Sequence, residues 1–220
     1  MLPTGIISNT VKPLQVTDSG EAALLRMQEY NLTHLPVNEG VTYAGLVSIE
    51  ELMHVKKLQR PLREIFTKLS QPKVLNTAHI FDVMKAAIDW NVKVVPVVNE
   101  EHEYLGWITA ESCMRAFTIA NSILEPGCIL ELQSEKKDYQ LSDIARIAEE
   151  NNTEIQCFYV SRHPHNSLVN ITLKLSRTDV SAIVASLERY NYEIINVYND
   201  VEYSGDLREH YEALMRYLNV

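Results

Sequence analysis

The first half of the chain contains an internal sequence repeat, and this repeat constrains the fold more than any other feature. Asn31 to Val37 aligns with Asn91 to Val97, so that Pro36 matches Pro96. After one inserted residue, Gly45 to Glu50 aligns with Gly106 to Glu111. Two copies in register indicate two supersecondary units of the same kind.

Each copy has the pattern strand, helix, strand, strand, helix. Asp18 and Glu21 have the spacing of a capping box, which predicts that the first helix begins there. Asn31 suits the end of that helix because asparagine tolerates a left-handed backbone. We expect Pro36 at a strand start or edge, since proline has no N–H to donate. The second copy predicts a helix over residues 80–90, strands over 94–98 and 105–108, and a final helix capped by Thr109.

This duplicated unit resembles the CBS (cystathionine-β-synthase) domain pair. The resemblance rests on the Pro-Val strand and on the later turn from glycine through two apolar residues to serine or threonine. It predicts a CBS pair over residues 1–125, with repeats at about 5–58 and 65–125. CBS pairs bind adenosine-containing nucleotides in clefts between the repeats and regulate a partner. The resemblance therefore implies a non-catalytic regulator with no cofactor, whose ligand would be AMP, ATP or S-adenosylmethionine.

The family also indicates which residues would line these clefts. A serine or threonine at a helix start and an acid one turn later reach the ribose, and here these positions hold Ser48 with Glu51, and Thr109 with Ser112. Only the first cleft keeps an acid, so we expect it to be the better site. For phosphate contacts the nearest cations are His34, Lys93 and Arg115. Ordinary helix caps and solvated surface cations remain the alternative interpretation of all seven residues.

The pattern changes after Pro126-Gly127. Alternating strands and two amphipathic helices in the order βαββαβ predict a ferredoxin-like domain over residues 128–202. The arrangement resembles an ACT domain, which implies dimerisation and an amino-acid or other small effector. The stretch 138–141 lacks the glycine usual in effector-binding members. Residues 203–220 predict a helix whose apolar stripe packs on its own domain or on a second subunit. The fold class is α+β.

Composition excludes several functions. A net charge of −9 disfavours nucleic acid and anionic membrane surfaces. We find no signal peptide and no spanning segment, and three scattered cysteines fit buried thiols in the cytoplasm. His163 and His165 lie in an expected turn without a third ligand, so no metal site is predicted. No catalytic motif is present, so no enzyme is expected.

Two alternatives stay open: a homodimeric interaction module without ligand, and an amino-acid sensor acting through the ACT-like domain.

Overall fold

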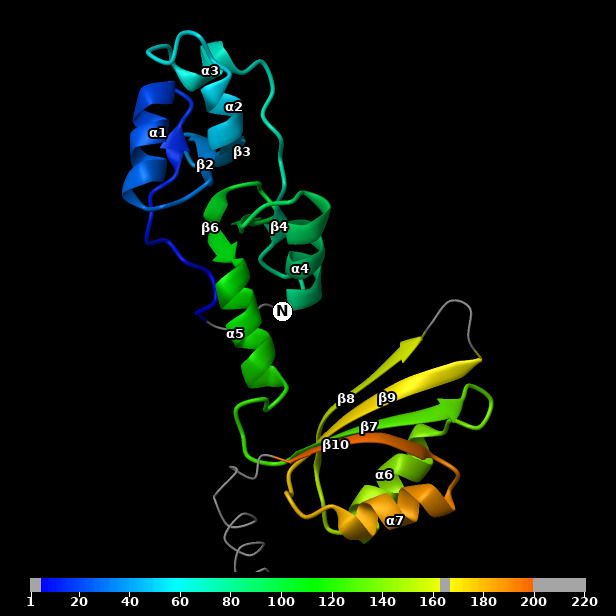
Figure 1. The fold of residues 1–220 in the computed structure, drawn as a ribbon. Coiled ribbons are helices and arrows are strands. Elements are labelled where there is room, and N and C mark those ends of the chain that lie inside the picture. Colours follow the sequence, from blue (N-terminus) through cyan, green and yellow to red (C-terminus); the bar gives the residue numbers. More distant parts are fainter. Residues whose placement is uncertain (1–4, 163–166, 200–220) are drawn as a thin grey trace, which may run out of the picture. The chain divides into compact units, whose positions relative to one another are not determined.

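A computed structural model describes residues 5–162 and 167–199 (Figure 1). The chain divides into two compact units, Met1–Phe117 and Thr118–Val220. The expected helix over residues 203–220, and the residues His163 and His165, lie outside the described residues. No helix in the described part combines the length and apolar character needed to cross a bilayer.

Both copies of the repeat form the expected order of elements. The first contains β1 (Leu14–Gln15), α1 (Gly20–Glu29), β2 (His34–Glu39), β3 (Thr42–Ser48) and α2 (Ile49–Met53). The second contains β4 (Val74–Leu75), α4 (Ile80–Asp89), β5 (Val94–Val98), β6 (Tyr104–Thr109) and α5 (Ala110–Ala120). A single turn of helix that the sequence pattern did not predict, α3 (Leu62–Ile65), lies between the two copies.

The start of α1 differs from the sequence-based prediction. The N-cap is Ser19, whose side chain accepts a hydrogen bond from the amide nitrogen of Ala22 at 3.2 Å. Asp18 instead accepts one from the amide of Gln15 at 3.0 Å. Its carboxylate therefore closes the turn after β1, and the hydroxyl one residue later caps the helix.

Each repeat forms a three-stranded sheet, in the orders β1-β2-β3 and β4-β5-β6. Pro36 and Pro96 consequently lie in the middle strands, and the expectation of an edge was wrong. The parallel partner strands begin only beside Val37 and Val97, one residue later. At each proline the sheet therefore has only two strands. The parallel strand that would accept a hydrogen bond from an N–H at this position is not yet present, so the missing N–H of proline leaves no ladder bond unmade.

The two repeats exchange edge segments. The amide of Leu46 in β3 donates to Ser70, in the segment that leads into the second repeat, at 2.8 Å. In the same way the amide of Trp107 in β6 donates to Ser8, in the segment that leads into the first repeat, at 3.1 Å. Apolar residues of both repeats belong to one buried cluster, among them Leu35, Val37, Val95, Val97 and Ile108. The two copies therefore fold around a shared core.

The second unit is a ferredoxin-like split βαββαβ motif. Its elements are β7 (Cys128–Glu135), α6 (Leu141–Glu150), β8 (Ile155–Arg162), β9 (Leu168–Leu175), α7 (Ser181–Arg189) and β10 (Glu193–Asn199). The strands form an antiparallel sheet in the order β10-β7-β9-β8. Both helices cover one face of this sheet (Figure 1), where Ile144 and Leu187 belong to the same buried cluster as Leu130 and Ile171. This arrangement is consistent with an ACT-like domain.

Candidate functional site

The polar groups of the first repeat gather where β3 passes into α2. Ser48 is the N-cap of α2, and its Oγ accepts a hydrogen bond from the amide of Glu51 at 3.1 Å. In return, Oε2 of Glu51 accepts hydrogen bonds from the amide and from the hydroxyl of Ser48, each at 2.8 Å. The residues proposed to hold a ribose are therefore bonded to each other, in a complete capping box.

His34 lies directly across the sheet from Ser48 in the β2–β3 register. Burial lowers the pKa of His34, the carboxylates of Glu51 and Glu50 oppose that shift, and the ammonium of Lys93 adds to it. Lys93 belongs to the second repeat, and its carbonyl accepts a hydrogen bond from the amide of Ala110 at the start of α5. The fold thus brings a hydroxyl, a carboxylate and a histidine of the first repeat near a lysine of the second.

The equivalent position in the second repeat is less polar. Oγ1 of Thr109 accepts a hydrogen bond from the amide of Ser112 and donates one to its Oγ, both at 3.0 Å. The residue across the sheet from Thr109 is Val94, so the second repeat has a valine at the position equivalent to His34. Arg115 lies on α5 beside Glu111, 3.9 Å away, with 75% of its side chain exposed. The structure therefore brings Thr109 and Ser112 together, and it pairs Arg115 with a carboxylate on its own helix.

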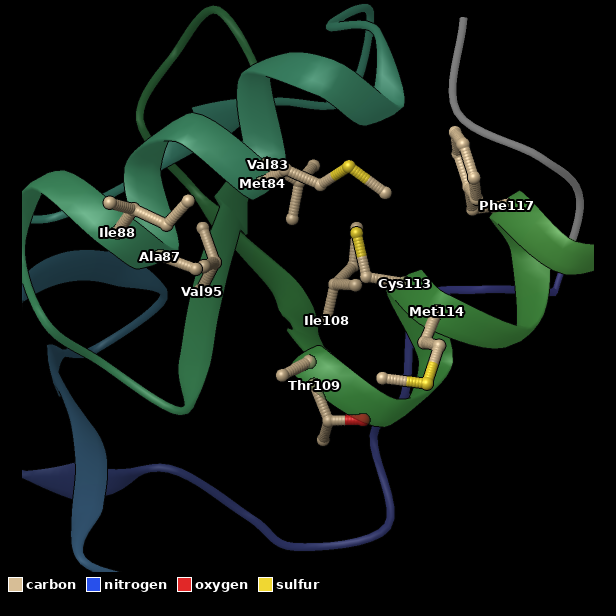
Figure 2. A pocket seen from close by; sticks show the side chains of 11 residues that line it. Val83, Met84, Ala87, Ile88, Val95, Ile108, Thr109, Cys113, Met114 and Phe117 are labelled. Carbon is tan, nitrogen blue, oxygen red and sulfur yellow. The ribbon is translucent and has the colours of Figure 1, made fainter. Parts of the chain in front are cut away.

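A hollow of about 280 Å³ opens between α4 and α5, and sequence analysis did not anticipate it. Figure 2 shows Met84, Cys113 and Phe117 around it, with Val95 and Ile108 of the strands at its base. Apart from Thr109, its lining side chains carry no oxygen or nitrogen. A comparison of the two repeats contained the signal, because Ala87 and Cys113 replace the larger Met27 and Leu52.

In the second unit, the turn before α6 is closed by a tyrosine. The hydroxyl of Tyr192 accepts a hydrogen bond from the amide of Gln140 and donates one to its carbonyl, both at 3.1 Å. An effector that approached this turn would have to displace the tyrosine, because the main-chain groups that it would use are already bonded. Among residues 5–162 and 167–199, no three metal-binding side chains come together.

Tandem βαββα repeats that exchange edge segments around one core define a paired-repeat module. The model of the CBS domain family matches residues 5–57 and 62–119. These two matches span half of the chain, and the chain belongs to this family. CBS domain pairs are in general regulatory modules without catalytic activity.

Solved structures similar to this chain include three CBS proteins. One is a CBS domain pair/ACT domain protein from Thermotoga maritima, 20% identical, with 52% of this chain and 94% of that chain covered and a TM-score of 0.47. A second is CBSX2 in complex with AMP, with 19% identity, 52% and 93% coverage and a TM-score of 0.46. A third is CbpB in complex with c-di-AMP, with 20% identity, 54% and 82% coverage and a TM-score of 0.44.

Proposed function

We propose that this protein is a non-catalytic regulator that binds an adenosine-containing nucleotide beside Ser48, where β3 passes into α2, and signals to a protein partner. The observation that carries this proposal is the convergence of four side chains from both repeats: His34, Ser48, Glu51 and Lys93. Membership of the CBS family supports it, since the family binds such ligands between its repeats. All three cysteines are free thiols, which supports a cytoplasmic location.

Each of these side chains has a chemical role in such a complex. The carboxylate of Glu51 accepts hydrogen bonds from the ribose hydroxyls, for which it has two oxygens. Lys93 is exposed and offers a cationic contact to a phosphate. His34 is half-buried with a lowered pKa, so its imidazole offers a neutral N–H donor. The second cleft offers Thr109 and Ser112, which are neutral, so we assign it the weaker affinity.

A thermal-shift titration with AMP, ATP and S-adenosylmethionine tests the proposal, because a ligand that binds only the native state raises its melting temperature. We expect at least one of these adenylates to stabilise the protein. The double variant Ser48→Ala/Glu51→Ala should remove the shift, whereas Ser112→Ala should keep most of it. No shift with any adenylate at millimolar concentration would refute nucleotide binding, and an unchanged shift in the double variant would place the site elsewhere.

A second candidate function is a homodimeric interaction module. It is favoured by exposed apolar residues on the helix pairs of both repeats: Leu25 is 66% exposed, Met53 74%, Ile88 79% and Met114 69%. The two functions are compatible, because regulation by a CBS pair can act through its dimer. Native mass spectrometry at micromolar concentration decides the oligomeric state, and a monomer would remove this candidate.

A further inference from the structure

The edge strand β10 carries an exposed apolar residue on the face of the sheet that the helices cover. β10 pairs with β7, and Val197 lies directly opposite Leu130, which is 0% exposed in the core. Opposite residues of an antiparallel pair point to the same face, so Val197 points toward the helix layer. Ile194, on this same face, packs against the core. Val197 nevertheless keeps 44% of its surface exposed, so the helix layer ends before it covers the last part of β10.

A hollow of about 460 Å³ lies at this place, between α7 and β10. Its lining includes Val197 and Val180, and Val180 belongs to the buried cluster of this unit. The lining residues of α7 recur at the spacing of one helix face and are Ser181, Val184, Ala185 and Glu188. The hollow is therefore continuous with the core, and an apolar occupant would extend that core.

The chain itself supplies a segment that begins at this hollow. Asn199, the last residue of β10, is a lining residue, and residues 200–220 follow it in the sequence. Apolar residues of this segment recur at the spacing of one helix face, namely Leu207, Tyr211, Leu214 and Leu218. The opposite face would carry the charged residues Glu209, Glu212 and Arg216. Such a helix has one apolar stripe to bury and one face suited to solvent.

The dimensions of the segment and the hollow agree. A helix over residues 206–218 would be about 20 Å long at about 1.5 Å per residue. The seven residues of β10 span about 23 Å. Residues 200–205 reach at most about 20 Å when extended, which is enough for the chain to turn back along β10.

We propose that residues 203–220 form a helix that docks in the α7–β10 hollow of the same chain, with its apolar stripe on Val184, Ala185 and Val197. The short connection gives the segment an effective concentration on the order of millimolar at the hollow. Its own chain is therefore favoured over a second copy at micromolar concentration. The inference depends neither on the nucleotide site nor on the homodimer.

The direction of the docked helix follows from where it begins. Asn199 and Ser181 line the same hollow, so the end of β10 lies beside the start of α7. A segment that leaves Asn199 and turns back along β10 consequently runs parallel to α7. Arg208, next to the apolar stripe, is then at the end of the hollow that carries Asp179, and the two charges are complementary.

Cysteine cross-linking of the full chain tests the docking. Cys113→Ala and Cys157→Ser leave only Cys128, which is 0% exposed, and Ala185→Cys then places one reactive thiol in the hollow. A second cysteine is introduced singly, either on the stripe or on the opposite face. The stripe variants are Leu207→Cys, Tyr211→Cys and Leu214→Cys, and the matched controls are Glu209→Cys, Glu212→Cys and Arg216→Cys. After mild oxidation we expect disulfides within one chain for the stripe variants and few for the controls.

Each other outcome of the cross-linking overturns the inference. Disulfides between different chains would assign the hollow to the segment of a second copy. Equal yields from both faces would show a segment that samples the hollow without docking as a helix. An absence of links in all six variants would place the segment elsewhere.

Hydrogen–deuterium exchange gives a second test with a matched pair of variants. Ile195 is 45% exposed, about as much as Val197, but it lines a different hollow together with Tyr159 on the other face of the sheet. In the unmodified chain we expect the amides of residues 208–218 to exchange about tenfold or more slower than in an unstructured peptide. Val197→Asp should abolish this protection, and Ile195→Asp should keep it.

The exchange of β7 amides shows whether the second unit of Val197→Asp remains folded. If it does not, Leu214→Asp replaces it, because that variant alters the docking segment alone. Protection of residues 208–218 that survives in Val197→Asp, or in Leu214→Asp, would contradict docking in this hollow. Exchange of these amides at the unstructured rate in the unmodified chain would also overturn the inference.

Discussion

Oε2 of Glu51 lies 2.8 Å from both the amide nitrogen and the hydroxyl oxygen of Ser48. The carboxylate that would recognise a ribose therefore also caps its own helix, and it cannot satisfy both partners fully with the same oxygen. A ribose bound through Oε2 would exchange a capping interaction, worth about 1 kcal/mol, for its own hydrogen bonds. The two functions of this carboxylate make Glu51 the most informative position of the proposed site.

Glu51→Gln separates these two functions. A glutamine at this position still caps the helix, so the free energy of unfolding should fall by less than about 1 kcal/mol. A neutral amide loses the charge-assisted bonds to the ribose, and we expect AMP affinity to fall by about tenfold. Urea denaturation and isothermal titration measure the two quantities. Equal affinity of the variant and the wild-type protein would argue against a ribose at Glu51.

Ser112→Asp should restore an acid to the second cleft. The position lies in the first turn of α5, where a carboxylate interacts favourably with the helix dipole, so folding should be preserved. We expect titration calorimetry with AMP to show a second binding event that the wild-type protein lacks at the same concentrations. Ser112→Asn is the uncharged control and should resemble wild type. An unchanged stoichiometry in Ser112→Asp would mean that this cleft does not admit the nucleotide.

The sequence was sufficient for the order of elements within each repeat, because the same pattern occurs in both copies. Asn31 and Asn91, for example, both end a helix with φ of 50°, as expected for asparagine at a left-handed position. The middle-strand location of Pro36 was not predictable from the local pattern. It depends on a partner strand that begins one residue later, and strand pairing is a long-range property.

The candidate site was predictable only in part. Ser48 and Glu51 share one helical turn, so their contact follows from sequence spacing. The approach of Lys93 to His34 joins the two repeats and required the three-dimensional packing. The hollow beside Cys113 depends on how much volume each repeat places under its helices. Hydrophobic periodicity records which positions are apolar and carries no information on whether their side chains fill the space between elements.

His34 should make the protein less stable in acid. Burial lowers its pKa in the folded state below the value of 6.5 that applies to the unfolded chain. The unfolded state therefore binds the proton more strongly, and the free energy of unfolding falls as pH drops through 6.5 toward the folded pKa. The His34→Gln variant lacks this contribution. Urea denaturation between pH 7.5 and pH 5 should show a smaller loss of stability in the variant, and parallel pH profiles would contradict the assignment.

Any side chain at Gly45 or Gly106 should strongly lower the free energy of unfolding. A Cβ at Gly45 would collide with Leu69 and lie 2.7 Å from the carbonyl oxygen of Ser70. One at Gly106 would lie 2.6 Å from Cγ2 of Ile7. These glycines let the exchanged edge segments approach β3 and β6, so alanine at either should destabilise the protein by about 3 kcal/mol or more.

Gly40→Ala is the matched control for this effect. Gly40 has φ of +63°, and a Cβ added there would meet no heavy atom within 4 Å, so only backbone strain of about 1–2 kcal/mol applies. Urea midpoints compare the three variants. If Gly40→Ala were as harmful as the other two, close approach of the exchanged segments would not be the cause.

Tyr43 and Tyr104 are two buried tyrosines whose hydroxyl groups differ in hydrogen bonding. Their rings stack with centroids 6.3 Å apart, where the hairpins of the two repeats meet. The hydroxyl of Tyr43 donates to the carbonyl of Pro72 at 2.9 Å, whereas that of Tyr104 has no hydrogen-bond partner among the described residues. Burial raises the pKa of both phenols, so both are neutral at physiological pH.

Phenylalanine at these two positions should therefore have different effects. Tyr43→Phe leaves the carbonyl of the buried Pro72 without its donor, and the free energy of unfolding should fall by about 1–3 kcal/mol. Tyr104→Phe removes a hydroxyl that is desolvated without compensation, so its effect should be neutral or stabilising. Both variants keep the stacked rings, so urea denaturation compares the hydroxyls alone. A loss in Tyr104→Phe equal to that in Tyr43→Phe would show that the Tyr104 hydroxyl is hydrogen-bonded in solution, with an ordered water as the simplest donor or acceptor.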